Sequence, residues 1–574
     1  MAEIHWLNAV NGSFDTGANW SGGAVPGAGD DAILDAAGGG FSVTAYESDT
    51  VDSLQLSSNA SIGIENVFTS TSGTGSGANA GSIVVENEFI TGGRIRNSGT
   101  IETISTENAF SAFVDIVSDT KVSGAGTIDL NDYGSKRDRK SHIAMVVGST
   151  TNQVTLTNVD NTIEATDGSD TISVGEGSAI VNNKAGAITS HSELVLAPTV
   201  EGDLWSLVNS GEIETTTNAR ITVEDADISG KGGRIVAELE SNVSIEGCTV
   251  VGQSLTTDQE GSIGFSDSNV TLKGTIQNGG VIAFTSSGAN TALKLSGDTV
   301  LTGGDIGDGG GKFFIEGRIL AGKADVVLDN LNNTIYGEGQ IGNAKMTLVN
   351  EASGAILADA GLAPMIIDTG ANTIENGGLL EGSYNSLVLK SPVANDGTII
   401  ATEGTVQAQG VVSGDGVAQV QGGLLQFLSA FNENVTFNGS GELALARSEG
   451  YSGAISGFST TGATSLGVMD IEFVNAGEAT FSGTAISGIL TISDGTHSAH
   501  IDLIGDYQDA SFTAASDGQG GTIVVAGGAE GAKSPHAFIS AMAAFRASAA
   551  HCERAGVAWP AREPLLAAPR VVAA

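Results

Sequence analysis

The chain has little cysteine, few aromatic residues and few basic ones. Its 574 residues include two cysteines, and 24 Lys and Arg stand against 66 Asp and Glu, a formal charge of −42. So acidic a protein repels phosphate, which excludes nucleic acid as its main partner. No apolar run reaches the roughly 18 residues that a membrane-spanning helix needs. The acidity is compatible with calcium as a cofactor, with basic partner surfaces, or simply with solubility.

The scarce residue types also narrow the fold. Cys248 and Cys552 lie far apart and belong to no CxxC or other metal-binding spacing, so export would not depend on a disulfide framework. Cys248 is predicted to be a small buried core residue. Aromatic residues make up 5% of the chain, which suits a narrow interior, and 82 glycines suit closely stacked backbones. Because 40% of the residues are hydrophobic, a continuous core is still expected.

A short phrase recurs along the chain: an Asn, one to three residues, a Gly, any residue and then an aliphatic residue. Clear copies are Asn97–Ile101, Asn209–Ile213, Asn278–Ile282, Asn376–Leu380 and Asn395–Ile399. Asn and Gly tolerate the left-handed backbone of a sharp corner, and the aliphatic residue then points inward. Turn-then-strand units that recur in this way indicate a β-solenoid. Corner asparagines of such a fold can stack into hydrogen-bonded ladders.

The spacing of the corners predicts the size of one coil, meaning one turn of the solenoid. Between Asn350, Asn376 and Asn395 the corners recur at roughly 19 to 26 residues, which corresponds to one three-sided coil. With parallel strands about 4.8 Å apart, roughly twenty coils would make a rod of order 100 Å. We therefore predict an all-β fold, a right-handed parallel β-helix (β-solenoid), over residues 41–457.

The N-terminal segment differs from this repetitive part. Residues 1–40 contain Trp6 and Trp20, two of the four Trp in the chain, together with Phe14. An open solenoid end exposes unpaired strand edges and apolar interior, so these rings are predicted to form a cap. The alternative is that they bind a ligand.

The C-terminal segments differ again. Residues 458–526 alternate in an antiparallel manner around Asp-Gly turns and predict a small β module. Residues 527–574 predict a flexible linker, a short helix that begins at Ser534, and a disordered tail. From Lys533 onward five Lys and Arg stand against two Glu, the reverse of the body.

Several of these motifs carry a family resemblance. At the start of the chain they are Trp6, Gly12-Ser-Phe14, Asn19-Trp20, Gly23-Ala-Val-Pro26-Gly27 and Asp30-Asp31-Ala-Ile33. They resemble the N-terminal pattern of autotransporter-passenger-like and filamentous-haemagglutinin-like β-solenoids of proteobacteria. The stretch Thr491–His500, with Phe512 and Asp517–Thr522, resembles a C-terminal module of large secreted proteins of rhizobia and related alphaproteobacteria. The resemblance implies export and a surface or extracellular role, often an adhesive one.

The route of export and calcium dependence are not supported by motifs. Met1–Trp6 has neither a basic n-region nor an apolar h-region, so export without an N-terminal signal peptide is expected. The C-terminal tail could instead engage export machinery as an uncleaved signal. The chain also lacks the Gly-Gly-x-Gly-x-Asp arrays that bind calcium in related repeats.

Motifs for catalysis are equally scarce. Gly337–Gly342 spells GxGxxG, but such a match is expected by chance among 82 glycines, and no amphipathic helix follows it. His497 and His500, on a strand, would face opposite sides and could not chelate one ion.

Acidic pairs are the remaining catalytic candidates, because a parallel β-helix brings carboxylates of adjacent coils together on an outer face. Asp225 and Asp227 share a strand face if their segment is extended. Asp305 and Asp308 flank a Gly-rich turn near Lys312.

The sequence favours a secreted or cell-surface structural and adhesive protein that presents repetitive polar faces without catalysis. Its partners would be glycans or proteins of a host or cell surface. The alternative is an extracellular polysaccharide lyase or glycoside hydrolase of the parallel β-helix type. Sugar sites of that type usually carry aromatic platforms, and Trp205 is the one Trp between Trp20 and Trp559, which argues against the enzyme.

Overall fold

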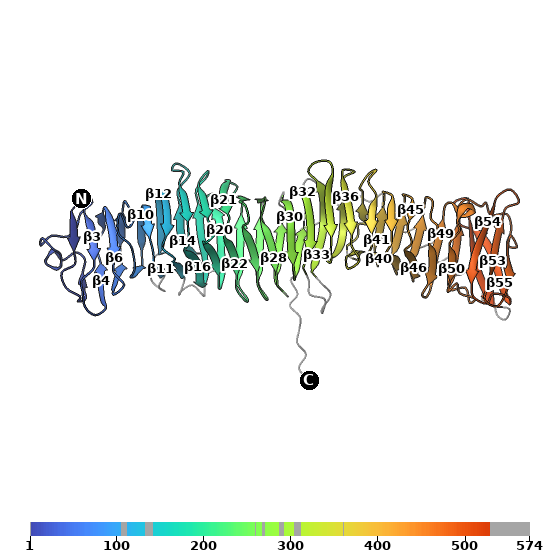
Figure 1. Ribbon diagram of the computed structural model, residues 1–574, viewed down its shortest axis with the longest axis horizontal. Coiled ribbons are helices and arrows are strands. Elements are labelled where there is room, and N and C mark those ends of the chain that lie inside the picture. The colour runs from blue at the N-terminus through green and yellow to red at the C-terminus, as the bar shows by residue number, and fades with distance from the viewer. Residues whose placement is uncertain are drawn as a thin grey trace, which may run out of the picture.

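The chain folds into a long rod of stacked coils (Figure 1). The computed structural model describes residues 2–104, 112–131, 142–258, 260–266, 270–285, 292–303, 311–359 and 361–528. It is an all-β parallel β-solenoid of about 18 turns with about 1% helix, so the predicted fold class is confirmed. The turns are of the right-handed type. Four predictions concern residues outside the described ones: the helix that begins at Ser534, and the single residues Cys552, Asp305 and Asp308.

Three faces run along the rod, each built of parallel strands, and most strands pair with their equivalents in the neighbouring coils. The first face contains β4 (Phe41–Ala45), β7 (Ala60–Ile64), β9 (Ser82–Val85), β11 (Thr100–Ile104), β13 (Thr127–Asn131), β16 (Thr162–Asp167), β19 (Ala187–Ser190), β22 (Glu212–Thr215), β25 (Arg234–Ala237), β28 (Ser254–Thr257), the C-terminal parts of β30 (Thr271–Asn278) and β32 (Leu293–Thr302), β34 (Val326–Asn330), β36 (Met346–Asn350), β39 (Ile374–Asn376), β42 (Val393–Asn395) and β45 (Val412–Ser413). The short β2 (Gly12–Ser13) pairs with β4 at its start.

The second face follows the first in each coil. It contains β5 (Asp49–Val51), β8 (Val67–Ser70), the N-terminal parts of β10 (Glu88–Arg96) and β12 (Phe113–Ser123), β14 (His142–Val147), β17 (Ser169–Val174), β20 (Glu193–Pro198), β23 (Arg220–Glu224), β26 (Asn242–Glu246), β29 (Ser262–Ser266), β31 (Val281–Thr285), the N-terminal parts of β33 (Lys312–Ala321) and β35 (Thr334–Ile341), β37 (Ala355–Ala358), β40 (Leu379–Ser383), β43 (Thr398–Thr402), β46 (Val417–Gln421), β48 (Asn434–Phe437) and β50 (Ala454–Ser456).

The third face completes the coil. It begins with the separate sheet of β1 (Glu3–His5), β3 (Asp31–Leu34) and β6 (Ser53–Leu56) and continues with the C-terminal parts of β10 and β12, β15 (Thr155–Asn158), β18 (Ala179–Asn182), β21 (Trp205–Asn209), β24 (Ala226–Ser229), β27 (Thr249–Val250), the N-terminal parts of β30 and β32, the C-terminal parts of β33 and β35, β38 (Met365–Ile367), β41 (Ser386–Leu389), β44 (Thr405–Ala408), β47 (Leu424–Phe427), β49 (Gly441–Leu445) and β51 (Thr464–Val468).

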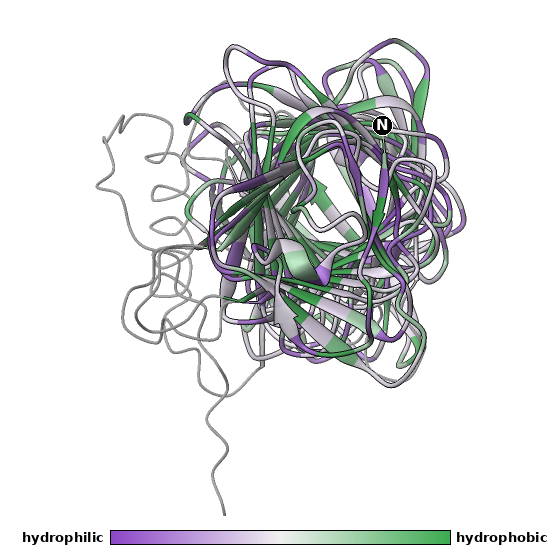
Figure 2. Cartoon of the chain, turned by 90° about the vertical axis from the view of Figure 1, so that its left-hand side faces the viewer, coloured by the Kyte–Doolittle hydropathy of each residue, from purple (hydrophilic) through white to green (hydrophobic). Residues whose placement is uncertain are grey.

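On most strands buried and solvent-facing residues alternate, which places the core inside the coils. On the first face the buried positions stack in register from Ile62 through Ile83, Ile101, Ile128, Ile163, Ile188 and Ile213 to Ile235. A β-branched side chain packs well on a pleated strand, and each buried one removes apolar surface from water. Figure 2 looks along the rod and shows hydrophobic and hydrophilic residues alternating around the stacked coils.

Buried amides form a first ladder at the corner between the third and first faces, over residues 79–253. Each Asn side-chain amide donates to a side-chain oxygen one or two coils further on, at 2.8 to 3.0 Å. Asn97 and Asn209 reach across the coil whose corner holds Gly124 or Gly230. The donor–acceptor pairs are Asn79–Asn97, Asn97–Asn161, Asn158–Asn182, Asn182–Asn209 and Asn209–Gln253. Asn158 and Asn161 belong to one coil and bond to each other through side chain and backbone. The predicted stacking of corner asparagines is thus confirmed.

A second ladder lies at a different corner, between the first and second faces, over residues 257–433. It begins with the Thr257 hydroxyl, which donates to Asn278 Oδ1 at 2.7 Å. It continues through Asn278–Asn333, Asn330–Asn350, Asn350–Asn376 and Asn376–Asn395. At its end Asn395 Nδ2 donates to Glu433 Oε2 at 2.7 Å. The same Asn-Gly phrase therefore serves two different corners of the coil.

Aromatic rings cluster at both ends of the rod. At the N-terminal end Trp20 contacts Trp6 edge-on at 5.0 Å between ring centroids and Phe14 at 4.9 Å, and all three are buried. The Trp20 Nε1 donates to the Phe14 carbonyl at 2.7 Å, which satisfies the buried indole. Phe14 also packs on Phe68, so these rings adjoin the first coils of the core.

At the other end the chain reverses its strand direction. Two antiparallel units follow β51: β52 (Ala479–Gly483), β53 (Ser487–Ser493) and β54 (Ser498–Ile504), then β55 (Ala510–Ser516) and β56 (Thr522–Gly528). β54 extends the second face and β56 extends the third. Phe512 packs against Phe458, Phe481 and Tyr507 between them.

Cys248 is 1% exposed, so its predicted burial is confirmed. Its Sγ accepts a hydrogen bond from the Ala226 backbone N–H, and burial raises the pKa of the thiol to about 12. A thiol held neutral in this way is a core residue rather than a nucleophile. Among the described residues no helix is long and apolar enough to cross a membrane.

Candidate functional site

The structure does not place the first predicted acidic pair on one strand face. Asp225 lies at the corner between β23 and β24 with a φ of 50°, so the segment is not extended there. Its carboxylate accepts a hydrogen bond from the Gly202 backbone N–H at 3.1 Å and braces the corner. Asp227 points outward from β24 and is exposed. The shared face expected for the two residues is therefore absent, because a left-handed residue breaks the alternation.

The second predicted pair lies outside the described residues, and its neighbour Lys312 is the first residue of β33. The structure instead brings together carboxylates that the chain separates by one coil each. On the first face, Glu102, Asp129 and Glu164 are direct partners in register on β11, β13 and β16. Two coils further on, the same outward row holds Glu214. We call Glu102, Asp129, Glu164 and Glu214, with Glu238 and His191 beside them, the acidic row.

Hydrogen bonds fix each carboxylate of the acidic row. Thr166 Oγ1 donates to Asp129 Oδ1 at 2.7 Å, and Asn131 Nδ2 donates to Glu102 Oε1 at 3.3 Å. Burial raises the pKa of Glu102, and repulsion by Asp129 adds to this effect. Burial likewise raises the pKa of Asp129, against the opposing hydrogen bond from Thr166.

His191 joins the row from the turn after β19. One ring nitrogen lies 3.3 Å from Glu164 Oε2, and the other lies 3.2 Å from Thr216 Oγ1. A carboxylate on one side and a hydroxyl on the other orient the imidazole ring.

Glu214, which lies beside Glu238, is the most strongly perturbed carboxyl group of the row. Burial raises the pKa of Glu214 to about 7, and a hydrogen bond with Glu238 together with repulsion by Glu212 and Glu238 adds to the shift. Arg234 opposes it and holds Glu212 at 2.9 Å. Two close carboxyl groups share a proton when both cannot ionise. Such a pair can serve in acid–base chemistry near neutral pH.

A polar groove of about 410 Å³ lies around the corner from this pair. It is lined by Ser192, Glu193, Asn218, Ala219, Arg220, Glu240, Ser241, Asn242, Glu260 and Ser262. Asn218, Glu240 and Glu260 occupy the corner with φ values of 63°, 57° and 64°. Left-handed residues other than glycine carry strain, which is common at functional sites. Glu214 and Glu238 do not line the groove, so the pair and the groove do not form one enclosed pocket.

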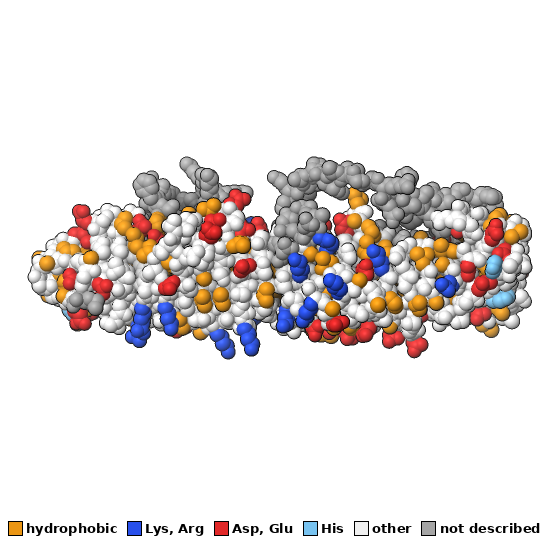
Figure 3. Space-filling model, turned by 90° about the horizontal axis from the view of Figure 1, so that it is seen from above, with side chains coloured by type: hydrophobic (Ala, Val, Ile, Leu, Met, Phe, Trp, Pro, Cys, Tyr) orange, Lys and Arg blue, Asp and Glu red, His pale blue; other side chains and the backbone are white. Residues whose placement is uncertain are grey.

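A larger groove of about 590 Å³ runs along the corner before the first face near the N-terminus. It is lined mainly by small residues such as Gly40, Ala60, Gly81 and Gly99. No titratable side chain lines it, so it has no group that could act as an acid, a base or a charged ligand. Figure 3 shows acidic side chains spread along the rod, with Lys and Arg in a few groups.

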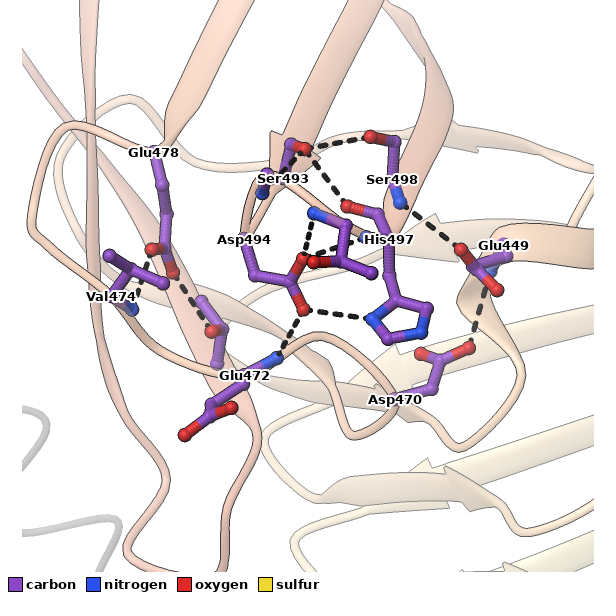
Figure 4. Close-up of polar contacts among 12 residues, drawn as sticks. Glu449, Asp470, Glu472, Val474, Glu478, Ser493, Asp494, His497 and Ser498 are labelled. Carbon is purple, nitrogen blue, oxygen red and sulfur yellow. Dashed lines mark hydrogen bonds and ion pairs between the residues drawn. The ribbon is translucent and has the colours of Figure 1, made fainter.

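The hairpin between β53 and β54 holds a second cluster of charged residues (Figure 4). Asp494 accepts backbone hydrogen bonds from Thr496 at 2.6 Å and His497 at 2.7 Å, and its other oxygen lies 3.0 Å from His497 Nδ1. These bonds, above all those with His497, hold the pKa of Asp494 well below its usual range and raise the pKa of His497. His497 thus sits in a turn rather than on a strand, and the cluster closes the hairpin.

Neither cluster has the geometry of a metal centre. No group of three or more His, Cys, Asp or Glu side chains in the described part of the chain is arranged to hold a metal ion. The arrangement therefore offers paired carboxylates and hydrogen-bond acceptors on open faces.

Sequence reasoning missed the acidic row because it searched along the chain instead of across coils. The signal is present in the repeated phrase itself: Gly99-Thr-Ile-Glu102, Gly126-Thr-Ile-Asp129, Asn161-Thr-Ile-Glu164 and Gly211-Glu-Ile-Glu214. Aligning these four copies would have shown an acidic residue after the inward isoleucine in each of them.

The stacked parallel coils define the class of the molecule, a parallel β-solenoid, and its outer faces are open and acidic. No protein-family model matches the chain, and no curated protein or solved structure shows significant similarity to it.

Proposed function

We propose that this protein is a non-catalytic structural and adhesive β-solenoid, displayed on the cell surface or released from the cell. It would act like the passengers of autotransporters and filamentous haemagglutinins, which its terminal motifs resemble. The observation that carries the proposal is the unbroken stack of about 18 coils. Such a rod holds flat outer faces away from the cell, and contact with partners is then spread along its length.

Two further features support an exposed, load-bearing rod. Aromatic clusters lie near both ends, where caps would limit end-to-end aggregation of open strand edges. The charge of −42 keeps long parallel rods apart in solution.

The location of the protein tests this proposal. Cells that produce the full chain are separated into cytosol, surface and medium, and intact cells are assayed for attachment to glycan- and protein-coated surfaces. We expect the protein at the surface or in the medium, with attachment lost when its gene is deleted. Confinement to the cytosol would refute the proposal.

We propose that the basic C-terminal tail directs export. Removal of residues 534–574 should then trap the protein inside the cell. Normal appearance in the medium would exclude the tail as the signal, whatever the function of the rod.

The Glu214–Glu238 pair favours one alternative, a polysaccharide lyase or glycoside hydrolase. A carboxyl group with a pKa of about 7 is suited to protonate a leaving group or abstract a proton. Release of reducing or unsaturated sugar ends from neutral and acidic polysaccharides, abolished in Glu214→Gln, would support the enzyme. If neither the unaltered protein nor Glu214→Gln releases sugar ends, the enzyme alternative fails and the adhesive function remains as the proposal.

A further inference from the structure

The outer side of the second face carries an unusual group of apolar and aromatic side chains between β33 and β43. Phe314, Tyr336, Leu357 and Ile400 lie in one outward row across successive coils, with Glu381 between the last two. Leu379 lies in the neighbouring row, and Leu362 and Tyr384 lie at the adjacent corner. We call these residues the aromatic surface.

This surface is bounded along the rod. Before it, the same row contains Gly264 and Ala283, and after it the row contains Gln419. Most aromatic rings of the described chain are buried in the coils or at the two ends. Here Phe314 and Tyr336 face outward, half-buried, with ring centroids 5.3 Å apart. The concentration of rings is therefore local and is not a property of the repeat.

Tyr384 is a bulky residue at a corner position that has a left-handed backbone in successive coils. Its φ is 62°, and its side chain is 72% exposed. The equivalent residues of the next two coils, by register, are Glu403 at a φ of 55° and Gly422 at 88°. A bulky residue in the left-handed region carries a steric cost that glycine would avoid.

Leu362 occupies the position equivalent to Tyr384 in the preceding coil and is 74% exposed. Two large side chains thus stand in solvent at the corner where the second face ends. Together with the outward rings, they make a local group of apolar and aromatic side chains, and such a group can mark a binding surface.

Polar groups border the rings on both sides. Lys312 precedes Phe314 on β33, while Glu316 and Glu338 are direct partners in the row that follows the rings. Glu338 Oε2 accepts the Ala363 backbone N–H at 2.6 Å. Acceptors that are fixed next to aromatic rings can bind hydroxyl groups.

The chemistry of this surface selects a sugar polymer. Aromatic rings pack against the apolar C–H faces of sugar rings, and carboxylates accept hydrogen bonds from the hydroxyls at their edges. The bordering carboxylates and the charge of −42 repel acidic polysaccharides. The row runs along the rod with one position per coil, so a chain that lies parallel to the axis meets Phe314 and Tyr336 in succession.

We propose that the aromatic surface binds a neutral polysaccharide that lies along the rod axis. This inference rests on the proposed adhesive function and deepens it by naming the class of ligand. The sugar chain contacts Phe314, Tyr336 and Tyr384, and its hydroxyls bond to Glu316 and Glu338.

Affinity electrophoresis of the purified full chain in gels with a neutral glucan or glucomannan tests the proposal, with alginate as the acidic polysaccharide. The informative variant is Tyr384→Gly, because glycine suits the left-handed backbone and should fold at least as well as tyrosine. We expect retardation by the neutral polymers, weakened about tenfold in Tyr384→Gly and further in a Phe314→Ala/Tyr336→Ala double variant. Tyr46→Ala, which removes a 54% exposed ring far from the surface, is the matched control and should bind as the unaltered protein does.

Equal retardation of the Tyr384→Gly, double-variant and unaltered proteins would overturn the proposal, as would retardation by alginate alone or by none of the polymers. Concentration-dependent self-association that Tyr384→Gly abolishes would overturn it in favour of a second copy of the chain. If purified protein fails to bind but cells still attach, the inference fails and the adhesive function stands. If the protein binds glucan but remains in the cytosol, the adhesive function fails alone.

Discussion

The two amide ladders both hydrogen-bond the buried polar side chains at a corner of the rod. They lie in different parts of the rod and end on different chemical groups. Over residues 79–253 the ladder consists of amides throughout, from Asn79 to Gln253. Over residues 257–433 it lies at the next corner and ends at the carboxyl group of Glu433. An amide has both donors and an acceptor, so it can pass hydrogen bonds along a stack, whereas a carboxylate only accepts. The comparison shows that the first ladder ends on an amide, whereas the second ends on a buried carboxyl group that cannot pass the hydrogen bonding on.

Removing an amide from the middle of either ladder should give the largest effect. Asn182→Ala and Asn350→Ala each remove a residue that is fully buried and bonded to the coils before and after it. Each leaves several buried polar groups unpaired, and we expect a loss of about 3 kcal/mol in the free energy of unfolding. Urea unfolding followed by circular dichroism measures it.

The exposed Asn438→Ala variant is the control for this pair and should change little. Similar losses at Asn182 and Asn350 would show that the two ladders are equivalent. A loss at one position only would show that one corner carries the stability of the rod.

Glu433→Gln should stabilise the second ladder at neutral pH. Glu433 is 6% exposed, Oε1 has no hydrogen-bond partner among the described residues, and burial raises the pKa of the carboxyl. A raised pKa in the folded state means that the folded chain holds the proton more tightly, so stability falls as pH rises from the ordinary carboxyl range through the raised pKa. We expect a gain of about 1 kcal/mol at pH 8 and almost none at pH 4.

Thermal unfolding of the two proteins across this pH range checks the expectation. A gain that is the same at pH 4 and pH 8 would contradict the role of the buried charge.

Glu214→Gln tests the titratable pair of the first region. Because the pKa of Glu214 is raised to about 7, its ionisation weakens the folded state as pH rises from about 4.5 through 7. The substitution should remove this slope and stabilise the protein at pH 8 by up to about 1 kcal/mol, since partial exposure screens the charge. Exposed Glu201→Gln is the control, and an unchanged pH slope in Glu214→Gln would show that the pair does not share a proton.

The smallest effects are expected at the strained corners. Glu240→Gly in the first region and Glu403→Gly in the second each place glycine at a φ near 56°, where L-residues are strained. The relief of strain outweighs the added freedom of the unfolded chain, so each should raise stability by about 0.5 kcal/mol. A decrease in melting temperature at either corner would show that its side chain contributes more than it costs.

The fold was predictable to a large extent because its code is local and repeated. The phrase around Asn97, Asn209 and Asn376 marked the corners, the alternation marked the strands, and the predicted asparagine ladders are present. The prediction of roughly twenty coils is close to the observed number of about 18. Cys248 was predicted to be buried from its residue type and isolation alone.

The candidate sites were less predictable, because they lie across coils. Asp225 and Asp227 are close in sequence, yet a left-handed corner separates their faces. Glu102, Asp129 and Glu164 are far apart in sequence and are direct neighbours in register. Neighbours along the chain were therefore the wrong place to search for a paired carboxylate site.

The sequence by itself determined the kind of structure: glycine and asparagine set the corners, and alternating aliphatic residues set what is buried. The register of the strands decided which corner each phrase occupies and which outward side chains become neighbours. The Asn-Gly phrases at Asn209 and Asn278 are alike in sequence, but they occupy different corners of the coil, and the rows of acidic and aromatic side chains exist only once the strands are aligned. Local residue preferences act within a few residues, whereas register is set by the packing and hydrogen bonding of whole coils about 20 residues apart.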